Sequence, residues 1–191
     1  TVIGYVQKVK ARYRHDARDQ DIVFVTGTLG DSQAGFHILN QNGQYINKGY
    51  YVNRHRMPSP RVEFANRLSD LERVVLNDIS DGLANEAAEI AEASKVDINL
   101  YDKKIPVSKD YDQFPVHLQQ NWKYFGGEDF ELLGTVGQSE WEFIKKIAKH
   151  VNLPVTEIGY VESNGANNGK VWLHENNHKK PLEKLGYVHF R

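Results

Sequence analysis

The sequence predicts a domain built from both β-strands and α-helices. Three regions carry this prediction: residues 21–26, 73–94 and 139–161. Residues 21–26 form a short run rich in β-branched and aromatic residues, which is typical of a buried strand. Residues 73–76 form a second apolar run, and the stretch 83–94 after it repeats apolar residues at the spacing of an amphipathic helix. Residues 139–151 predict another such helix, followed by a strand at 155–161.

The remaining elements are weaker in pattern. Further strands are expected at 1–10, 96–100 and 132–136, and further helices at 32–39, 60–68 and 116–122. Residues 40–53 are expected to form a loop or an irregular helix. The Asn-Gly pairs at 164–165 and 168–169 signal turns, so residues 170–173 are predicted to return as the hairpin partner of 155–161.

Length and composition exclude several classes of protein. The chain has 191 residues, which suits one large domain or a domain with an extension. A formal net charge of -1 gives no electrostatic footprint for nucleic acid or an anionic membrane, so neither partner is expected. Cysteine is absent, which excludes disulfides and thiolate catalysis and fits a cytoplasmic location. Because the first strand starts abruptly and without an initiator Met, we expect a fragment of a longer chain.

The strongest chemical signal is the loop 77–82, between the predicted strand and helix. Asp78 and Asp81 are hard oxygen donors of the kind that Mg²⁺ takes together with substrate phosphates. Backbone N–H groups at the start of a helix attract phosphate, and the Ser80 hydroxyl can bond a phosphate oxygen. The alternative is a simple helix cap, which also favours Ser and Asp.

Three other stretches have both a functional and a structural interpretation. Arg14, in the charged segment 11–20, either reaches a phosphate or belongs to a solvated connector. The glycine turn at 27–32 either packs a strand closely against a helix or forms a backbone nest for a ligand. The stretch 126–131, two glycines followed by acids, is either a ligand loop or a surface turn.

The string His174-Glu175-Asn176-Asn177-His178 fits the H-E-x-x-H pattern of zinc metalloproteases. That chemistry needs both histidines on one helical face. Here the string follows a short strand and contains two asparagines, which disfavour a helix. A turn is therefore predicted in place of a zinc site.

Several motifs together resemble thiamine-monophosphate kinase, in the superfamily of aminoimidazole ribonucleotide synthetase. The resemblance runs the length of the chain and rests on Arg14 with Ala17, on V-T-G-T-L-G-D-S at 25–32, P-S-P-R at 58–61, D-I-S-D-G-L at 78–83, G-G-E-D-F-E-L-L at 126–133 and G-Y-V-H-F at 186–190. It implies an α+β fold with a mixed or antiparallel sheet flanked by helices. It also implies two domains in the whole enzyme, with residues 1–12 as the last strand and linker of a missing amino-terminal domain and residues 13–191 as the carboxyl-terminal ATP- and substrate-binding domain.

The implied activity is transfer of the γ-phosphate of ATP to thiamine monophosphate, with Mg²⁺, by a homodimeric enzyme that needs no catalytic side chain. Carried over by position, Arg14 and Ser80 would contact ATP, and Asp78 and Asp81 would bind Mg²⁺. Glu128 would contact the substrate, as would Tyr187 or Phe190, of which Tyr187 is favoured.

The chain departs from the family pattern at Asp16 and Gln20, where glycines are usual, and at Phe130, where a tyrosine is usual. Because the family's first domain is missing, we expect this chain alone to be inactive. Two alternatives remain, another ATP-using enzyme of the superfamily and a non-catalytic nucleotide-binding module.

Overall fold

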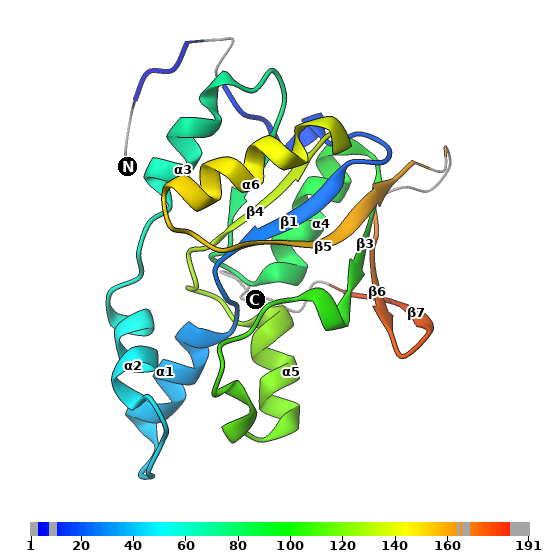
Figure 1. Cartoon of the computed structure of the whole chain (residues 1–191). Coiled ribbons are helices and arrows are strands. Elements are labelled where there is room, and N and C mark those ends of the chain that lie inside the picture. Colours follow the sequence, from blue (N-terminus) through cyan, green and yellow to red (C-terminus); the bar gives the residue numbers. More distant parts are fainter. Residues whose placement is uncertain (1–3, 8–10, 164, 166–168, 184–191) are drawn as a thin grey trace.

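The computed structural model of the chain describes residues 4–7, 11–163, 165 and 169–183. These residues form a seven-stranded sheet in the order β2-β4-β1-β5-β3-β6-β7 (Figure 1). The strands are β1 Ile22–Thr26, β2 Val75–Asp78, β3 Asp97–Tyr101, β4 Leu132–Val136, β5 Val155–Glu162, β6 Val171–Glu175 and β7 His178–Pro181. All neighbouring strands are antiparallel except β3 and β6, which are parallel. The predicted mixed sheet is confirmed.

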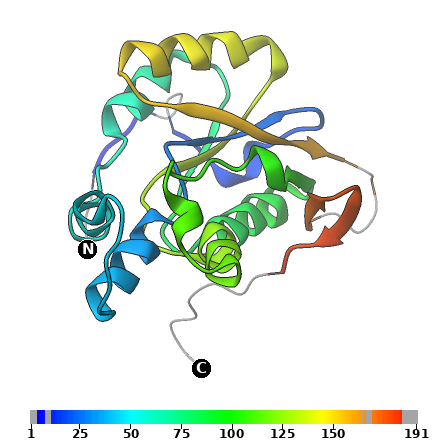
Figure 2. The ribbon, with the colours of Figure 1, turned by 60° about the horizontal axis from the view of Figure 1, so that its bottom comes forward.

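Helices cover both faces of the sheet. They are α1 Asp31–Asn40, α2 Lys48–Arg56, α3 Val62–Arg67, α4 Leu83–Ser94, α5 Val116–Phe125 and α6 Trp141–His150, with 3₁₀ turns η2 Arg14–Asp16, η3 Leu68–Asp70, η4 Asp102–Lys104, η5 Tyr111–Gln113 and η6 Gln138–Glu140. Figure 2 shows α6 and α4 on opposite sides of the sheet. The pair α1 and α2 extends beyond the sheet (Figure 1). Within the described ranges, none of the helices has the length and apolar character needed to cross a membrane.

The central strand β1 explains why both faces need cover. Val23 and Val25 point into the same apolar cluster as Ile90 of α4. Phe24 points the other way, into the cluster that contains Ile144 of α6. Successive strand side chains alternate between faces, so a strand that is apolar on both sides is stable only between two layers. Each such buried side chain contributes roughly 1.5–3 kcal/mol.

Most predicted elements are confirmed, and α4 covers the whole predicted range 83–94. Residues 40–53 proved partly helical, since α2 occupies residues 48–56. The strand expected at 1–10 is absent from residues 4–7, which hold no regular secondary structure, and the rest of that range lies outside the described residues. The domain division at residue 12 remains a prediction.

The predicted hairpin between 155–161 and 170–173 is wrong. β6 pairs with β3 in parallel and with β7 in antiparallel orientation, and it does not pair with β5. Both edges of β5 are already occupied by β1 and β3, so the returning strand adds beyond β3. The Asn-Gly turn signals describe only local backbone, whereas the choice of partner depends on the order of the whole sheet.

The turn predicted at 174–178 is confirmed. Asn176 and Asn177 have φ of 48° and 65° and connect β6 to β7. Two consecutive left-handed residues are typical of a tight hairpin turn. The His174 imidazole lies 2.9 Å from the Asn99 side-chain oxygen on the neighbouring strand.

Candidate functional site

The loop 78–82 lies between β2 and α4, as predicted. Its first residue, Asp78, ends β2 and is exposed, and Ser80 and Asp81 are half-buried. Gly82 precedes α4 with φ of 101°. A Cβ atom at Gly82 would lie 2.8 Å from the Phe125 backbone, so a side chain is excluded there by both conformation and contact.

A second loop, residues 126–131 between α5 and β4, packs against the first. The Glu128 amide donates to the Ser80 carbonyl at 2.8 Å, and the Phe130 amide donates to the Ile79 carbonyl at 3.0 Å. The Glu131 carbonyl in turn accepts from the Ile79 amide at 2.7 Å. These bonds continue the β2–β4 ladder past the strand ends and bring the two motif loops together.

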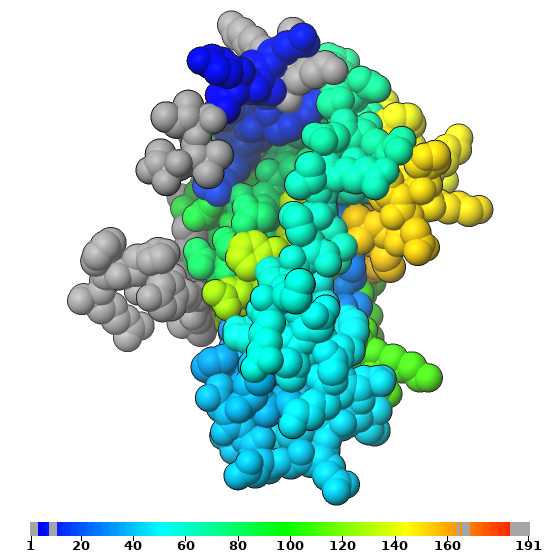
Figure 3. All heavy atoms as spheres, turned by 90° about the vertical axis from the view of Figure 1, so that its left-hand side faces the viewer, coloured from blue at the N-terminus to red at the C-terminus, as the bar shows by residue number. Residues whose placement is uncertain are grey.

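Glu128 stands at the exposed side of this contact. Its backbone is left-handed, with φ of 65°, a strained conformation for a residue other than glycine. Its side chain is 59% exposed, and a carboxylate oxygen lies 3.8 Å from Nδ1 of His55 on α2. The same nitrogen lies 3.1 Å from the Ser32 hydroxyl. In Figure 3 the yellow-green loop between α5 and β4 reaches the surface beside the cyan stretch that joins α2 to α3.

Arg14 is brought to the same place from the chain's amino-terminal part. Its guanidinium donates to the Asn77 side-chain oxygen from Nε at 3.2 Å and from Nη2 at 3.0 Å. A third nitrogen lies 2.7 Å from the Glu89 carboxylate on α4. The Arg14 carbonyl accepts from the Ser94 hydroxyl at 2.7 Å, which anchors the η2 backbone to α4. The Arg14 side chain stays half-exposed.

The departure from the family pattern at Gln20 has a structural counterpart. Gln20 adopts φ of 65°, a conformation that glycine takes without strain and glutamine does not. The chain keeps the turn because the Gln20 amide donates to the Val161 carbonyl at 3.0 Å. The fold around Arg14 therefore tolerates the missing glycine.

Glu86 is a functional candidate that sequence reasoning missed. It is 3% exposed and accepts hydrogen bonds from the Asn77 side chain, from the Ser80 hydroxyl at 3.4 Å and from the Asp81 amide at 3.3 Å. Burial raises the pKa of Glu86 to about 7, and the nearby acids Glu89, Asp78 and Asp81 add to the effect. The sequence did contain a signal for Glu86. It is an acid on the apolar face of the predicted helix, where a buried charge needs a hydrogen-bond partner.

The acids of the 126–131 loop have a structural role. Asp129 is buried and accepts from the amides of Gly30 at 2.6 Å and Ser32 at 2.9 Å, which caps α1. Of the two interpretations of the 27–32 turn, close packing is therefore supported, since these amides bind the chain's own carboxylate. Burial raises the pKa of Asp129 to about 7, while the two amide bonds act in the opposite direction.

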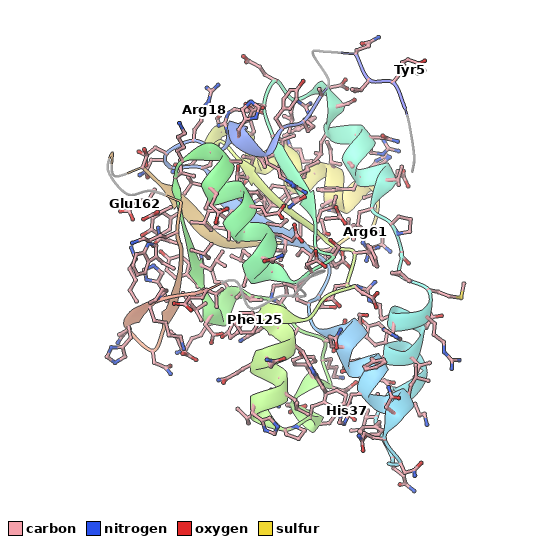
Figure 4. The ribbon with its side chains drawn as sticks, turned by 180° about the vertical axis from the view of Figure 1, so that it is seen from behind. Tyr5, Arg18, His37, Arg61, Phe125 and Glu162 are labelled. Carbon is pink, nitrogen blue, oxygen red and sulfur yellow. The ribbon has the colours of Figure 1, made fainter. Side chains whose placement is uncertain are left out.

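Glu131 lies at the centre of a buried ion cluster. It accepts from the Thr26 hydroxyl at 2.6 Å and from Arg54 at 2.9 Å, and it pairs with Arg61 through two guanidinium nitrogens. Figure 4 shows Arg61 on the stretch between α2 and α3, on the side that faces the strands. Arg61 and Glu131, both from the motifs, thus join two loops far apart in the chain.

The predicted site residues therefore divide into two groups. Arg14, Asp78, Ser80 and Asp81 are brought together around the 78–82 loop, and Glu128 joins them through the Ser80 carbonyl. Tyr187 and Phe190 lie outside the described residues. Among the described residues no three acids or histidines gather closely enough to form a metal site by themselves. Asp78 and Asp81 supply two carboxylates, and these are hard donors that fit Mg²⁺ with additional ligands from elsewhere.

Comparison with known proteins finds a similar sequence and a similar solved structure. The chain is 43% identical over its whole length to the thiamine-monophosphate kinase of Bacillus subtilis (strain 168). It spans 59% of that relative's length. The structure of AaThiL complexed with AMPPCP and TMP superimposes with a TM-score of 0.74, at 31% identity, over 94% of this chain and 54% of that one.

A more distant neighbour shows the fold alone. The hydrogenase maturation protein HypE in complex with ATP has a TM-score of 0.75 at 19% identity, over 93% of this chain and 54% of that one. The sequence model of the family described as "AIR synthase related protein, C-terminal domain" matches residues 18–171, most of the chain. The chain therefore belongs to the family of AIR synthase related proteins, and residues 18–171 correspond to the C-terminal domain of that family.

Proposed function

We propose that this chain is the carboxyl-terminal part of an enzyme that transfers the γ-phosphate of ATP to thiamine monophosphate and so makes thiamine diphosphate. The observation that carries the proposal is the convergence of Arg14, Ser80 and two carboxylates on one loop that opens to solvent. The 43% identical relative and the neighbour complexed with AMPPCP and TMP support the choice of substrates.

Arg14 and Ser80 are the proposed nucleotide contacts. A guanidinium donates in a fixed fork that matches phosphate oxygens, and Arg14 is half-exposed and aligned by Asn77. Ser80 lies on the turn that leads into α4, where free backbone amides and the helix dipole favour negative charge. Together these groups hold and neutralise the phosphate chain.

Asp78 and Asp81 are the proposed magnesium ligands. Within the described residues, neither aspartate forms an ion pair with a lysine or an arginine, so both carboxylates keep their charge available. Bound Mg²⁺ would neutralise the phosphates as charge moves during transfer. The remaining ligands would come from the phosphates, from water and from the amino-terminal domain that we expect to precede this chain.

The reaction needs no nucleophilic side chain. A phosphate oxygen of thiamine monophosphate attacks the γ-phosphorus, the bond to the β-phosphate oxygen breaks, and ADP leaves. Such a transfer depends on positioning and charge neutralisation. Glu128 is the proposed contact that orients the substrate, with Tyr187 or Phe190 as a second contact near the carboxyl end. We further propose a homodimeric, cytoplasmic enzyme, in which this chain alone is inactive.

Calorimetric titration of the full-length protein tests this proposal. Full-length here means this chain joined to the amino-terminal domain that we expect before it. We expect saturable binding of AMPPCP with Mg²⁺, then of thiamine monophosphate, and loss of the second step in Glu128→Gln. Nucleotide binding without thiamine monophosphate binding would favour another ATP-using enzyme of the superfamily. If Asp81→Asn leaves the turnover and the magnesium dependence of the full-length protein unchanged, this chain would be a non-catalytic module within that protein.

A further inference from the structure

Helix α4 carries a buried acid directly beneath the 78–82 loop. Glu86 shares the buried side of α4 with Leu83 and Ile90, where an acid is costly unless its oxygens are hydrogen-bonded. Its two oxygens bond different groups. Oε2 accepts from the Asn77 side chain, and Oε1 accepts from the Ser80 hydroxyl and the Asp81 amide.

Asn77 extends this connection to Arg14. It is 6% exposed and its side-chain oxygen accepts from two Arg14 nitrogens, at 3.2 and 3.0 Å. Because a guanidinium only donates, the Asn77 oxygen must face Arg14 and the Asn77 nitrogen must face Glu86. The Glu86 side chain then completes the pattern, since its oxygens accept from Asn77, Ser80 and Asp81. The donor and the acceptor of each hydrogen bond between Arg14 and Ser80 are therefore defined.

We propose that Asn77 and Glu86 are positioning residues for the nucleotide, which hold Arg14 and Ser80 at the separation that the phosphate chain requires. This inference rests on the proposed function, because it assumes that Arg14 and Ser80 contact ATP. Neither Asn77 nor Glu86 needs to touch the nucleotide. Their effect is to align a flexible arginine from one segment with a hydroxyl from another before the ligand arrives, which lowers the ordering cost of binding.

A reversal of the pair tests the inference. Glu86→Gln places an amide nitrogen against either the Asn77 nitrogen or the Asp81 amide, and Asn77→Asp turns a carboxylate toward Glu86. The double variant N77D/E86Q restores one acceptor and one donor. Its carboxylate at position 77 can accept both from Arg14 and from the new amide at position 86, while the oxygen of that amide still accepts from Ser80 and Asp81. Net charge is the same in the double variant as in the original. Glu140→Gln, at an exposed position outside these contacts, is the control for charge.

The measurement is the Kd of AMPPCP with Mg²⁺ in the full-length protein, together with KM for each substrate. We expect each single variant to raise Kd and KM for the nucleotide roughly tenfold, the usual scale for groups that orient a ligand-binding residue. KM for thiamine monophosphate should change by less than about twofold, since the Glu128 carboxylate lies near His55 and its backbone bonds the Ser80 carbonyl rather than the Ser80 hydroxyl. The double variant should return to within about threefold of the original, because paired residues are not additive.

The outcomes separate this inference from the proposed function. If the unchanged protein binds neither AMPPCP nor thiamine monophosphate, both fail. If it binds both and the single variants leave nucleotide Kd unchanged, only the positioning role fails. Equal rises in KM for both substrates would also overturn the role and indicate general destabilisation. The same holds if the rise in nucleotide Kd in the double variant equals the combined rises of the two single variants. Should a single variant fail to fold, Asn77→Ala removes the link without opposing like groups and should give the same roughly tenfold rise.

Discussion

The two motif loops contain similar residues, yet the structure uses them in opposite ways. In the 78–82 loop, Asp78 is exposed and Asp81 half-buried, and within the described residues neither carboxylate forms an ion pair with a lysine or an arginine. In the 126–131 loop, Asp129 and Glu131 are each 1% exposed and bond the chain itself. An acid in a glycine-rich turn therefore indicates a binding site only where the fold supplies no donor for it. This difference leads to four predictions, from the largest expected effect to the smallest.

Glu131→Gln should destabilise the chain most. The substitution removes the charge that pairs with Arg54 and Arg61, and breaking a buried ion pair from one side costs about 3–5 kcal/mol. Urea unfolding of the 191-residue chain measures the change. Asp78→Asn is the matched control in the other loop and should alter stability by less than about 0.5 kcal/mol. If both substitutions changed the free energy of unfolding equally, the acids of the two loops would not differ in their structural role.

Asp81→Asn should instead affect catalysis. The amide keeps the size of the side chain and removes its charge, so the fold is retained while a proposed magnesium ligand is lost. We expect kcat/KM of the full-length protein to fall about 100-fold, with a higher magnesium requirement. Initial rates over a magnesium series measure both. A fall in melting temperature that accounts for the lost activity would contradict the assignment.

Asp129 should make stability depend on pH. Burial raises its pKa from 3.8 to about 7, so the folded chain retains a proton that the unfolded chain has released between these values. The contribution of Asp129 to stability is therefore greatest below about pH 4 and declines as pH rises to about 7. Urea unfolding at several pH values, compared with Asp129→Asn, isolates this slope. A contribution that grows with pH would mean that the Gly30 and Ser32 amide bonds outweigh burial.

His55→Asn should have the smallest effect. Nδ1 of His55 lies 3.8 Å from Glu128 and 3.1 Å from the Ser32 hydroxyl, so it limits where an otherwise exposed carboxylate can lie. We expect KM for thiamine monophosphate to rise about threefold, with nucleotide KM unchanged. Steady-state kinetics in the Glu128→Gln background is the control, and there the His55 substitution should have no further effect.

Sequence patterns predicted local structure well and long-range bonding poorly. The strand, loop and helix around residues 77–94 were predictable because apolar spacing and turn residues are local properties. The pairing of β6 with β3 was not predictable, because it depends on which sheet edges the other strands leave open. The resemblance identified Arg14 as a candidate, but the side-chain contacts from Asn77 to Glu86 and from Arg61 to Glu131 appear only once distant segments are packed together.

Gly27 adds a constraint on how this chain can change over generations. A Cβ atom at Gly27 would lie 2.2 Å from a Glu131 carboxylate oxygen, and the Gly27 backbone is left-handed, with φ of 58°. Any side chain at position 27 would displace the carboxylate that pairs with Arg54 and Arg61. The space at position 27 and the acid at position 131 therefore depend on each other in this structure. A descendant could gain a side chain at 27 only after it had lost the acid at 131, and the intermediate would carry two arginines without their shared carboxylate.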